Sequence, residues 1–288
     1  MPAAALALVL AAAVLHSTWN ALAKRGRHQL SFLWWSTTVA TVLFAPLTVP
    51  MAVATGLPRA AWPYVAATIV IHGIYFYALG RAYRSGDFSV VYPVARGLGV
   101  ALVPMLALAF FDERPSPLGA IGIALVVVGI VGLHLAGRAW AGAAAALRQL
   151  GPGTWWAMAT GLATAAYSLV DKAGVARLHP VPYIAFMFLG MSLVLLPVVL
   201  TDTSALRREW TSNWRAILVA AVMTLSAYLL VLFAFQLSKA AYVVATREVS
   251  IVLSAVIGSL WFKEGALAPR LAGAAVVLAG VACVALAR

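Results

Sequence analysis

The sequence predicts an all-α integral membrane protein with ten transmembrane helices in a 5+5 inverted repeat. Three observations lead to this fold class: an extreme apolar composition, ten long apolar stretches, and a residue pattern that recurs in both halves. Of the 288 residues, 64% are hydrophobic and only 10% are charged, whereas soluble domains carry about 45–50% apolar and about 25% charged residues. Such a chain belongs in a bilayer, and we expect a multi-pass protein of the cell inner membrane.

Ten stretches are long enough to cross the bilayer, because a spanning helix needs about 20 predominantly apolar residues. Charged residues, Gly and Pro separate these apolar stretches from one another. The predicted spans are residues 3–24, 30–53, 62–82, 88–111, 116–137, 154–174, 181–201, 214–237, 240–262 and 266–287. A transmembrane barrel would alternate apolar and polar residues in segments of about ten. These runs are continuously apolar, so the spans are predicted to be helices.

The net charge of +12 does not indicate nucleic-acid binding, since no basic patch is interleaved with aromatic residues on a soluble module. Most basic residues lie at helix ends, where anionic lipid headgroups attract them. The loops on one side of the membrane carry more Lys and Arg than those on the other. This bias predicts that both termini lie outside the cytoplasm.

The same residues recur at a fixed offset in the two halves. With a shift of 151 residues, VVYPVARGLGV (90–100) overlies AYVVATREVSI (241–251). The matched pairs are Arg96 with Arg247, Glu113 with Glu264, Gly122 with Gly273, and Gly129 with Gly280. We therefore expect a first repeat over 1–137, a linker over 138–153 and a second repeat over 154–288. Five spans per half place the second copy in the opposite orientation, an architecture found in many secondary transporters.

The ends of the two halves resemble a known family. FFDERPSPLGAIGIALVVVGIVGL and LWFKEGALAPRLAGAAVVLAGVACVAL are similar to the EamA-type transporters of the drug/metabolite transporter superfamily, in which a helix, a short loop with a Glu and a Gly-rich last helix occur twice. The resemblance covers essentially the whole chain. It implies a 5+5 bundle that moves small metabolites by alternating access. The opening VLHSTWNALAKR is also similar to a subgroup associated with phosphonate utilisation.

The resemblance and the charge bias disagree about orientation. The family usually has both termini in the cytoplasm, whereas the distribution of Lys and Arg predicts the reverse. Membrane orientation therefore stays open.

Two arginines lie deep within predicted spans. An Arg at mid-membrane costs about 2.5–3.5 kcal/mol on insertion scales, so Arg96 and Arg247 should face the interior of the bundle. Because the repeat makes them equivalent, they should approach the central axis from opposite halves. Guanidinium groups stay charged and bind phosphate, phosphonate or carboxylate in a bidentate manner. Together they predict a binding site for an anionic substrate.

The alternative interpretation is an internal lock. Arg96 or Arg247 would then pair with Glu248 or Asp171 and only hold the helices together. The spans contain two acids against Arg96, Arg247 and Lys172, so the interior should carry net positive charge unless an anion is bound. Both interpretations can hold if the substrate displaces the lock.

Polar and aromatic side chains at helical spacing extend this candidate site. In the first span His16 and Asn20 share a face beside Trp19, and in the sixth Tyr167 flanks a polar stripe that ends at Lys172. The full set of predicted substrate-binding residues is Arg96, Arg247, Tyr92, His16, Trp19, Asn20, His72, Tyr75, Tyr167, Lys172, Glu248 and Ser250. The alternative for the Ser and Thr positions is hydrogen bonding between helices without a substrate.

Proton coupling through Glu248 is left open. Burial would favour its protonated form, whereas pairing with an arginine would keep it ionised. A 5+5 chain contains both inverted copies, so a functional monomer is plausible.

The predicted function is a secondary transporter for a small anionic or zwitterionic metabolite: an amino acid, an organic acid or an organophosphonate. The alternative is a multidrug exporter of lipophilic cations that uses Glu248 and an aromatic cavity, although nearby arginines would repel a cation. The five histidines are scattered without a metal-ligand spacing. We therefore predict no enzymatic activity, no metal and no cofactor. The expected partners are a small-molecule substrate and the lipid bilayer.

Overall fold

The protein is a bundle of α-helices in the computed structural model, which describes residues 1–24, 26–85, 88–135, 151–253 and 267–287. The described part of the first half forms α1 (Ala3–Lys24), α2 (Gln29–Thr55), α3 (Trp62–Ser85), α4 (Phe88–Phe111) and α5 (Pro117–Leu135). The described part of the second half forms α7 (Pro152–Val175), α8 (Pro180–Val199), α9 (Thr203–Leu237), α10 (Ala240–Arg247) and α12 (Leu267–Leu286). Within these ranges no strand is present.

The prediction of an all-α membrane protein is confirmed. Among the described residues, five helical segments are long and apolar enough to cross a bilayer, and two shorter helices, within α5 and α12, are also apolar. The helices coincide with the predicted spans to within a few residues at most ends. The last part of the predicted span 240–262 lies outside the described residues. Ten membrane crossings therefore remain a prediction.

The predicted start of the eighth span differs from the observed helix. α9 already begins at Thr203, after a short 3-10 turn, and non-helical backbone at Asn213 (φ −130°, ψ 15°) divides it. Asp202 caps this helix, since its carboxylate accepts the Ala205 N–H at 2.8 Å. Hydrogen bonds from the Ser204 hydroxyl and the Ala205 N–H lower the pKa of Asp202. The sequence missed this segment because its charged residues exclude it from an apolar span.

Glu209 holds the segment before the kink against the first half. Its buried carboxylate accepts the His28 N–H at 2.9 Å and the Asn213 amide at 2.7 Å. The start of α9 is thereby fixed to the connection between α1 and α2.

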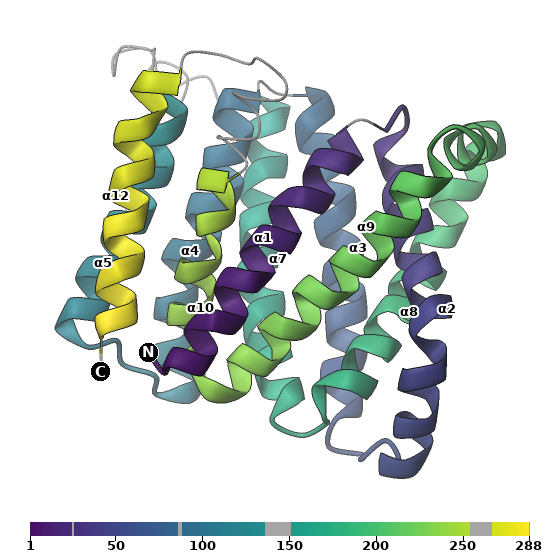
Figure 1. Cartoon of the computed structure of the whole chain (residues 1–288), viewed down its shortest axis with the longest axis horizontal. Coiled ribbons are helices and arrows are strands. Elements are labelled where there is room, and N and C mark those ends of the chain that lie inside the picture. Colours follow the sequence, from purple (N-terminus) through teal and green to yellow (C-terminus); the bar gives the residue numbers. More distant parts are fainter. Residues whose placement is uncertain (25, 86–87, 136–150, 254–266, 288) are drawn as a thin grey trace.

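The helices stand in a broad bundle with α5 and α12 at one end and α2 and α8 at the other (Figure 1). α1 packs against α9, and α3 packs against α7, which also contacts α4. α7 is therefore largely surrounded by protein. This position explains why α7 carries buried Thr, Ser and Asp side chains that a lipid-facing helix would not tolerate.

α5 and α12 approach closely through glycine. A Cβ on Gly122 would lie 2.6 Å from the Gly280 carbonyl oxygen, and a Cβ on Gly280 would lie 2.6 Å from the Gly122 carbonyl oxygen. A Cβ on Gly129 would likewise lie 3.0 Å from the Gly273 carbonyl oxygen. The order of these contacts shows that the two helices run antiparallel. Small residues that let backbones approach are a common means of association between membrane helices.

We expect Gly280→Ala to destabilise the protein by about 1–3 kcal/mol, because the new methyl group overlaps backbone atoms of α5 that cannot move aside. Thermal unfolding of the detergent-purified protein measures the effect. Gly132→Ala on α5 is the control, since the nearest atom to its Cβ is 3.8 Å away. Equal melting temperatures for the two variants would contradict this account of the contact.

Candidate functional site

The α-helical hydrogen-bonding pattern breaks at Arg247 and Glu248. α10 ends at Arg247, and a turn at Glu248 precedes further helical residues, 249–253. Within this turn the Glu248 N–H bonds back to the Ala245 carbonyl at 3.2 Å, and the Ile251 N–H bonds to the Glu248 carbonyl at 2.9 Å. Both are tighter i→i+3 bonds. Such a break inside a buried helix is often found at functional sites.

Glu248 binds Arg96 across the two halves of the chain. Arg96 Nη2 lies 2.7 Å from Glu248 Oε1, and Arg96 Nε lies 3.0 Å from Oε2. The side chains are 11% and 4% exposed. This bidentate geometry is the strongest form of an arginine–carboxylate contact. The structure therefore contains an ion pair between Arg96 and Glu248, as the internal-lock interpretation of Arg96 predicts.

Arg247 lies beside this pair without a carboxylate of its own. The residue is 9% exposed and occupies the last turn of α10, where the helix dipole favours a cation. Its guanidinium stands over the Tyr228 ring, with 5.6 Å from Cζ to the ring centroid. Within the described part of the chain, Arg247 makes no hydrogen bond or ion pair. Its charge is therefore available to an added anion.

Aromatic rings form a wall next to Arg247, which we call the aromatic wall: His72, Tyr75, Tyr167 and Tyr228. His72 stacks on Tyr167 with centroids 4.2 Å apart, and Tyr75 meets the edge of Tyr167 at 5.6 Å. His72 also meets Tyr228 edge-on at 5.5 Å. Tyr228 therefore links the other rings of the aromatic wall to the Arg247 guanidinium. A flat or apolar ligand group can pack on such rings, and a cation can bind their faces.

Asp171 lies behind the aromatic wall and is fully buried. Its Oδ1 accepts the Thr68 hydroxyl at 2.5 Å and the Tyr183 hydroxyl at 2.7 Å. Its Oδ2 accepts the Tyr228 hydroxyl. The carboxylate thus joins α3, α7, α8 and α9. The sequence singled out Asp171 only as a partner for an arginine, because the three hydroxyl donors lie on three other helices.

The predicted residues of α1 lie near both arginines. The charges of Arg96 and Arg247 both act on His16, whose ring meets Trp19 edge-on at 5.1 Å. The Asn20 amide is turned back to the His16 carbonyl of its own helix at 2.8 Å. The buried Trp19 Nε1 has no hydrogen-bond partner among the described residues. His16 therefore lies near the arginines, Trp19 packs beside it in an apolar cluster with Phe32 and Ile217, and Asn20 is occupied locally.

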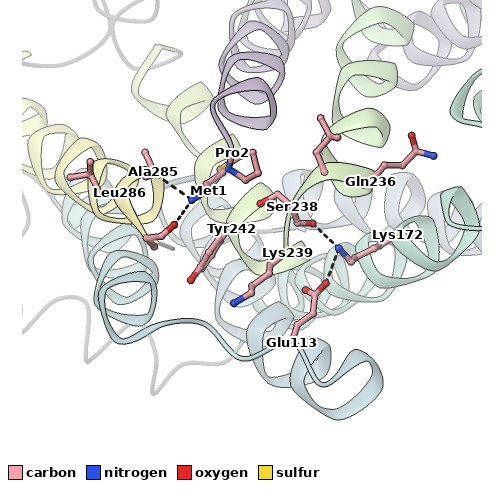
Figure 2. A pocket seen from close by; sticks show the side chains of 12 residues that line it. Met1, Pro2, Glu113, Lys172, Gln236, Ser238, Lys239, Tyr242, Ala285 and Leu286 are labelled. Atoms are coloured by element: carbon pink, nitrogen blue, oxygen red, sulfur yellow. Dashed lines mark hydrogen bonds and ion pairs between the residues drawn. The ribbon is translucent and has the colours of Figure 1, made fainter.

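Lys172 lies in a different place, at one end of the bundle (Figure 2). Its Nζ is 2.7 Å from Glu113 Oε1 and 2.6 Å from the Ser238 carbonyl. These residues line a cavity of about 790 Å³ beside Met1 and Tyr242. Because Glu113 neutralises Lys172, the interior is less positive than the sequence predicted. The sequence missed this pair because Glu113 belongs to a loop rather than a span.

Two further predicted residues complete the set. Ser250 is buried in the helical residues that follow Glu248. Tyr92 is part of α4, and its side chain lies outside the described residues. Among the residues that the structure describes, no group of three or more His, Cys, Asp or Glu side chains could hold a metal ion.

Comparison with known proteins adds three kinds of match. The model of the EamA-like transporter family matches residues 3–135 and again residues 151–286. A crystal structure aligns with a TM-score of 0.73 over 99% of this chain and 97% of the other, at 18% identity. At that identity the alignment shows a shared fold alone.

Curated relatives match over short segments. The quaternary ammonium compound-resistance protein QacE of Escherichia coli is 34% identical over 26% of this chain and 67% of its own length. The nicotine metabolites export pump subunit NepA of Paenarthrobacter nicotinovorans is 36% identical over 24% of this chain and 60% of its own length. The uncharacterized membrane protein YvaE of Bacillus subtilis is 34% identical, and the chain spans 56% of its length.

We expect Arg96→Gln to destabilise the protein by about 3–5 kcal/mol, because it leaves the Glu248 carboxylate buried without its cation. The double variant Arg96→Gln with Glu248→Gln should lose less, since it removes both charges of the pair and leaves neither of them buried alone. Denaturant titration in detergent measures both. Arg114→Gln is the control, because the partners of the Arg114–Asp112 pair are 79% and 81% exposed and such pairs contribute about 0–1 kcal/mol. This account would be contradicted if the double variant lost as much free energy of unfolding as the single variants Arg96→Gln and Glu248→Gln lose together.

Proposed function

Since the chain belongs to the EamA-like transporter family, we propose that it is a secondary transporter that moves a small anionic or zwitterionic metabolite by alternating access. Transport as such follows from the family, and the chain is a multi-pass protein of the inner membrane. The substrate class is our proposal. It rests on the free charge of Arg247.

The repeat explains why Arg247 has no carboxylate. With the offset of 151 residues, the pair Arg96–Glu248 corresponds to the pair Arg247–Gly97. Where the first arginine meets a glutamate, the second meets a glycine. Gly97 is buried, yet none of the described atoms lies within 4 Å of the position of a Cβ. We infer that the anionic group of the substrate takes the place beside Arg247 that Glu248 takes beside Arg96.

The packing of the helices supports the 5+5 inverted repeat on which this argument depends. The Gly122–Gly280 contact has its counterpart in the Gly129–Gly273 contact, as a two-fold relation between the halves requires. α1 packs on α9 as α7 packs on α3. We therefore propose two repeats, 1–137 and 154–288, joined by the linker 138–153, and a monomer as the transporting unit.

The aromatic wall would hold the organic part of the substrate. Tyr167 and His72 stack on each other, so each keeps one ring face for a ligand, and Tyr75 meets Tyr167 edge-on. The ammonium group of a zwitterion would bind these faces through cation–π contact. Amino acids, organic acids and organophosphonates all combine an anionic group with such a part.

A second candidate is export of lipophilic cations. The names of QacE and NepA support it, and so does the aromatic wall. Against it stands the state of Glu248, whose two oxygens are both occupied by Arg96. A cation would have to displace a bidentate guanidinium and tolerate Arg247 nearby.

We expect anions to raise the melting temperature of the detergent-purified protein in a panel of phosphonates, phosphate esters, dicarboxylates, amino acids and quaternary ammonium dyes. A ligand that binds only the folded state stabilises it by about 2.7 kcal/mol at a hundredfold excess over its dissociation constant. Arg247→Gln should abolish the shift while the variant still unfolds cooperatively. Arg215→Gln should leave it unchanged, since this exposed arginine also lies over a ring, that of Trp214. A shift given by the dyes and not by anions would favour the second candidate.

We expect the carboxylate introduced by Gly97→Glu to occupy the place proposed for the anionic group of the substrate. This carboxylate would pair with Arg247, stabilise the protein by about 1.5–3 kcal/mol relative to Gly97→Gln and abolish the shift produced by anions. Gly97→Gln has the same shape without the charge and therefore separates electrostatic from steric effects. Identical stability and identical loss of binding in both variants would place the anion elsewhere.

A further inference from the structure

Asp171 is a buried charge without a counterion in contact with it. The carboxylate is 0% exposed, and its partners in the described part of the chain are three neutral hydroxyl groups. Burying an ionised carboxylate is costly even when it is hydrogen-bonded. A protonated carboxyl group could remain in the same network, because it keeps acceptor positions and gains one donor. The geometry therefore accommodates both states.

A chain of hydrogen bonds leads to this carboxylate. His72 Nδ1 lies 2.9 Å from the Thr68 carbonyl oxygen, which can only accept, so Nδ1 carries the hydrogen. Nδ1 is also 3.0 Å from the Thr68 hydroxyl, which donates in turn to Asp171. If His72 takes a proton at Nε2, the hydrogen on Nδ1 can move to the Thr68 hydroxyl oxygen while the hydrogen of that hydroxyl moves to Asp171 Oδ1, so that His72 and Thr68 both end neutral.

Tyr228 joins the carboxylate to the proposed substrate site. Its hydroxyl donates to Asp171, and its ring lies under the guanidinium of Arg247. The opposite charges of Asp171 and Arg247 thus lie on either side of one tyrosine. Among the ionisable groups on the elements around Asp171 are Tyr167 and Lys172 on α7, His72 on α3, Arg96 on α4, Tyr183 on α8, Tyr228 on α9, Arg247 on α10, and Glu248 after it. Of these, Arg96 is held by Glu248, and Lys172 by Glu113.

An anion at Arg247 would remove the charge that offsets Asp171. The Arg247 guanidinium would then pair with the anion. The Asp171 carboxylate would be the remaining uncompensated charge in the network. Transfer of a proton from a hydronium ion of the solution, which becomes water, to an Asp171 oxygen would restore neutrality. We propose that Asp171 is a proton-binding site coupled to the anion site, so that the protein moves its anionic substrate together with a proton.

This inference rests on the proposed function and adds the coupling ion. Linkage is reciprocal: if anion binding promotes proton binding, protons promote anion binding by the same factor. Affinity for the anion should therefore rise as the pH falls. Uptake of one proton per anion changes the affinity by at most about tenfold per pH unit, and coupling between sites is typically 5–150-fold in total.

The test is titration calorimetry of the detergent-purified full chain with benzenesulfonate and with phenylphosphonate. Benzenesulfonate does not titrate between pH 5.5 and 8.5, so any proton taken up with it belongs to the protein. Buffers of different ionisation enthalpy give the number of protons bound per anion. We expect close to one proton for the wild type and close to none for Asp171→Asn. Asp112→Asn is the control, since Asp112 is exposed and its φ of 49° suits asparagine.

Difference infrared spectroscopy of the wild type provides a readout that does not require the variant to fold. Addition of benzenesulfonate should produce the carbonyl band of a protonated carboxylic acid. Anion binding without proton uptake, or uptake that persists in Asp171→Asn, would overturn the coupling and leave the anion site intact. If neither anion binds to the wild type at any pH, the anion site itself is wrong and the coupling is wrong with it.

Discussion

The cost of a guanidinium group inside a membrane governs the arrangement of this protein. Neither Arg96 nor Arg247 could face lipid, because each would cost several kcal/mol there. Arg96 is neutralised by Glu248 from the opposite half of the chain. Arg247 is surrounded by protein and an aromatic ring and keeps its charge. The helix breaks at the two residues where these demands meet, and the substrate site that we propose lies there, at the junction of the halves.

Close packing elsewhere makes this junction possible. Glycines bring the backbones of α5 and α12 together at one end of the bundle, and α7 lies among its neighbours with its polar side chains buried. The polar residues are consequently shielded from lipid by apolar helices. A rigid frame around a polar centre is what a transporter needs to bind a charged solute without exposing the charge to the bilayer.

The sequence predicted most of the helix positions and only part of the buried polar contacts between them. Helix positions could be predicted because each span is a local run of apolar residues, and Arg96 and Arg247 stood out because charge is rare there. On a helix, adjacent residues such as Arg247 and Glu248 are turned about 100° from each other, and Glu248 pairs with Arg96 instead. The hydroxyl groups around Asp171 come from three other helices, so no local pattern could reveal them. The Lys172–Glu113 pair was missed because Glu113 lies in a loop, outside the predicted spans.

Transport follows from the family, and the substrate class that we propose rests on Arg247. The central claim is that an anionic group binds at this arginine, beside Gly97 and the aromatic wall. An experimental structure with phenylphosphonate bound would test it most directly. The account predicts a phosphonate oxygen within hydrogen-bond distance of the Arg247 guanidinium and the phenyl ring against Tyr167 or His72. A phosphonate bound at the end of the bundle near Lys172, with no contact to Arg247, would contradict it.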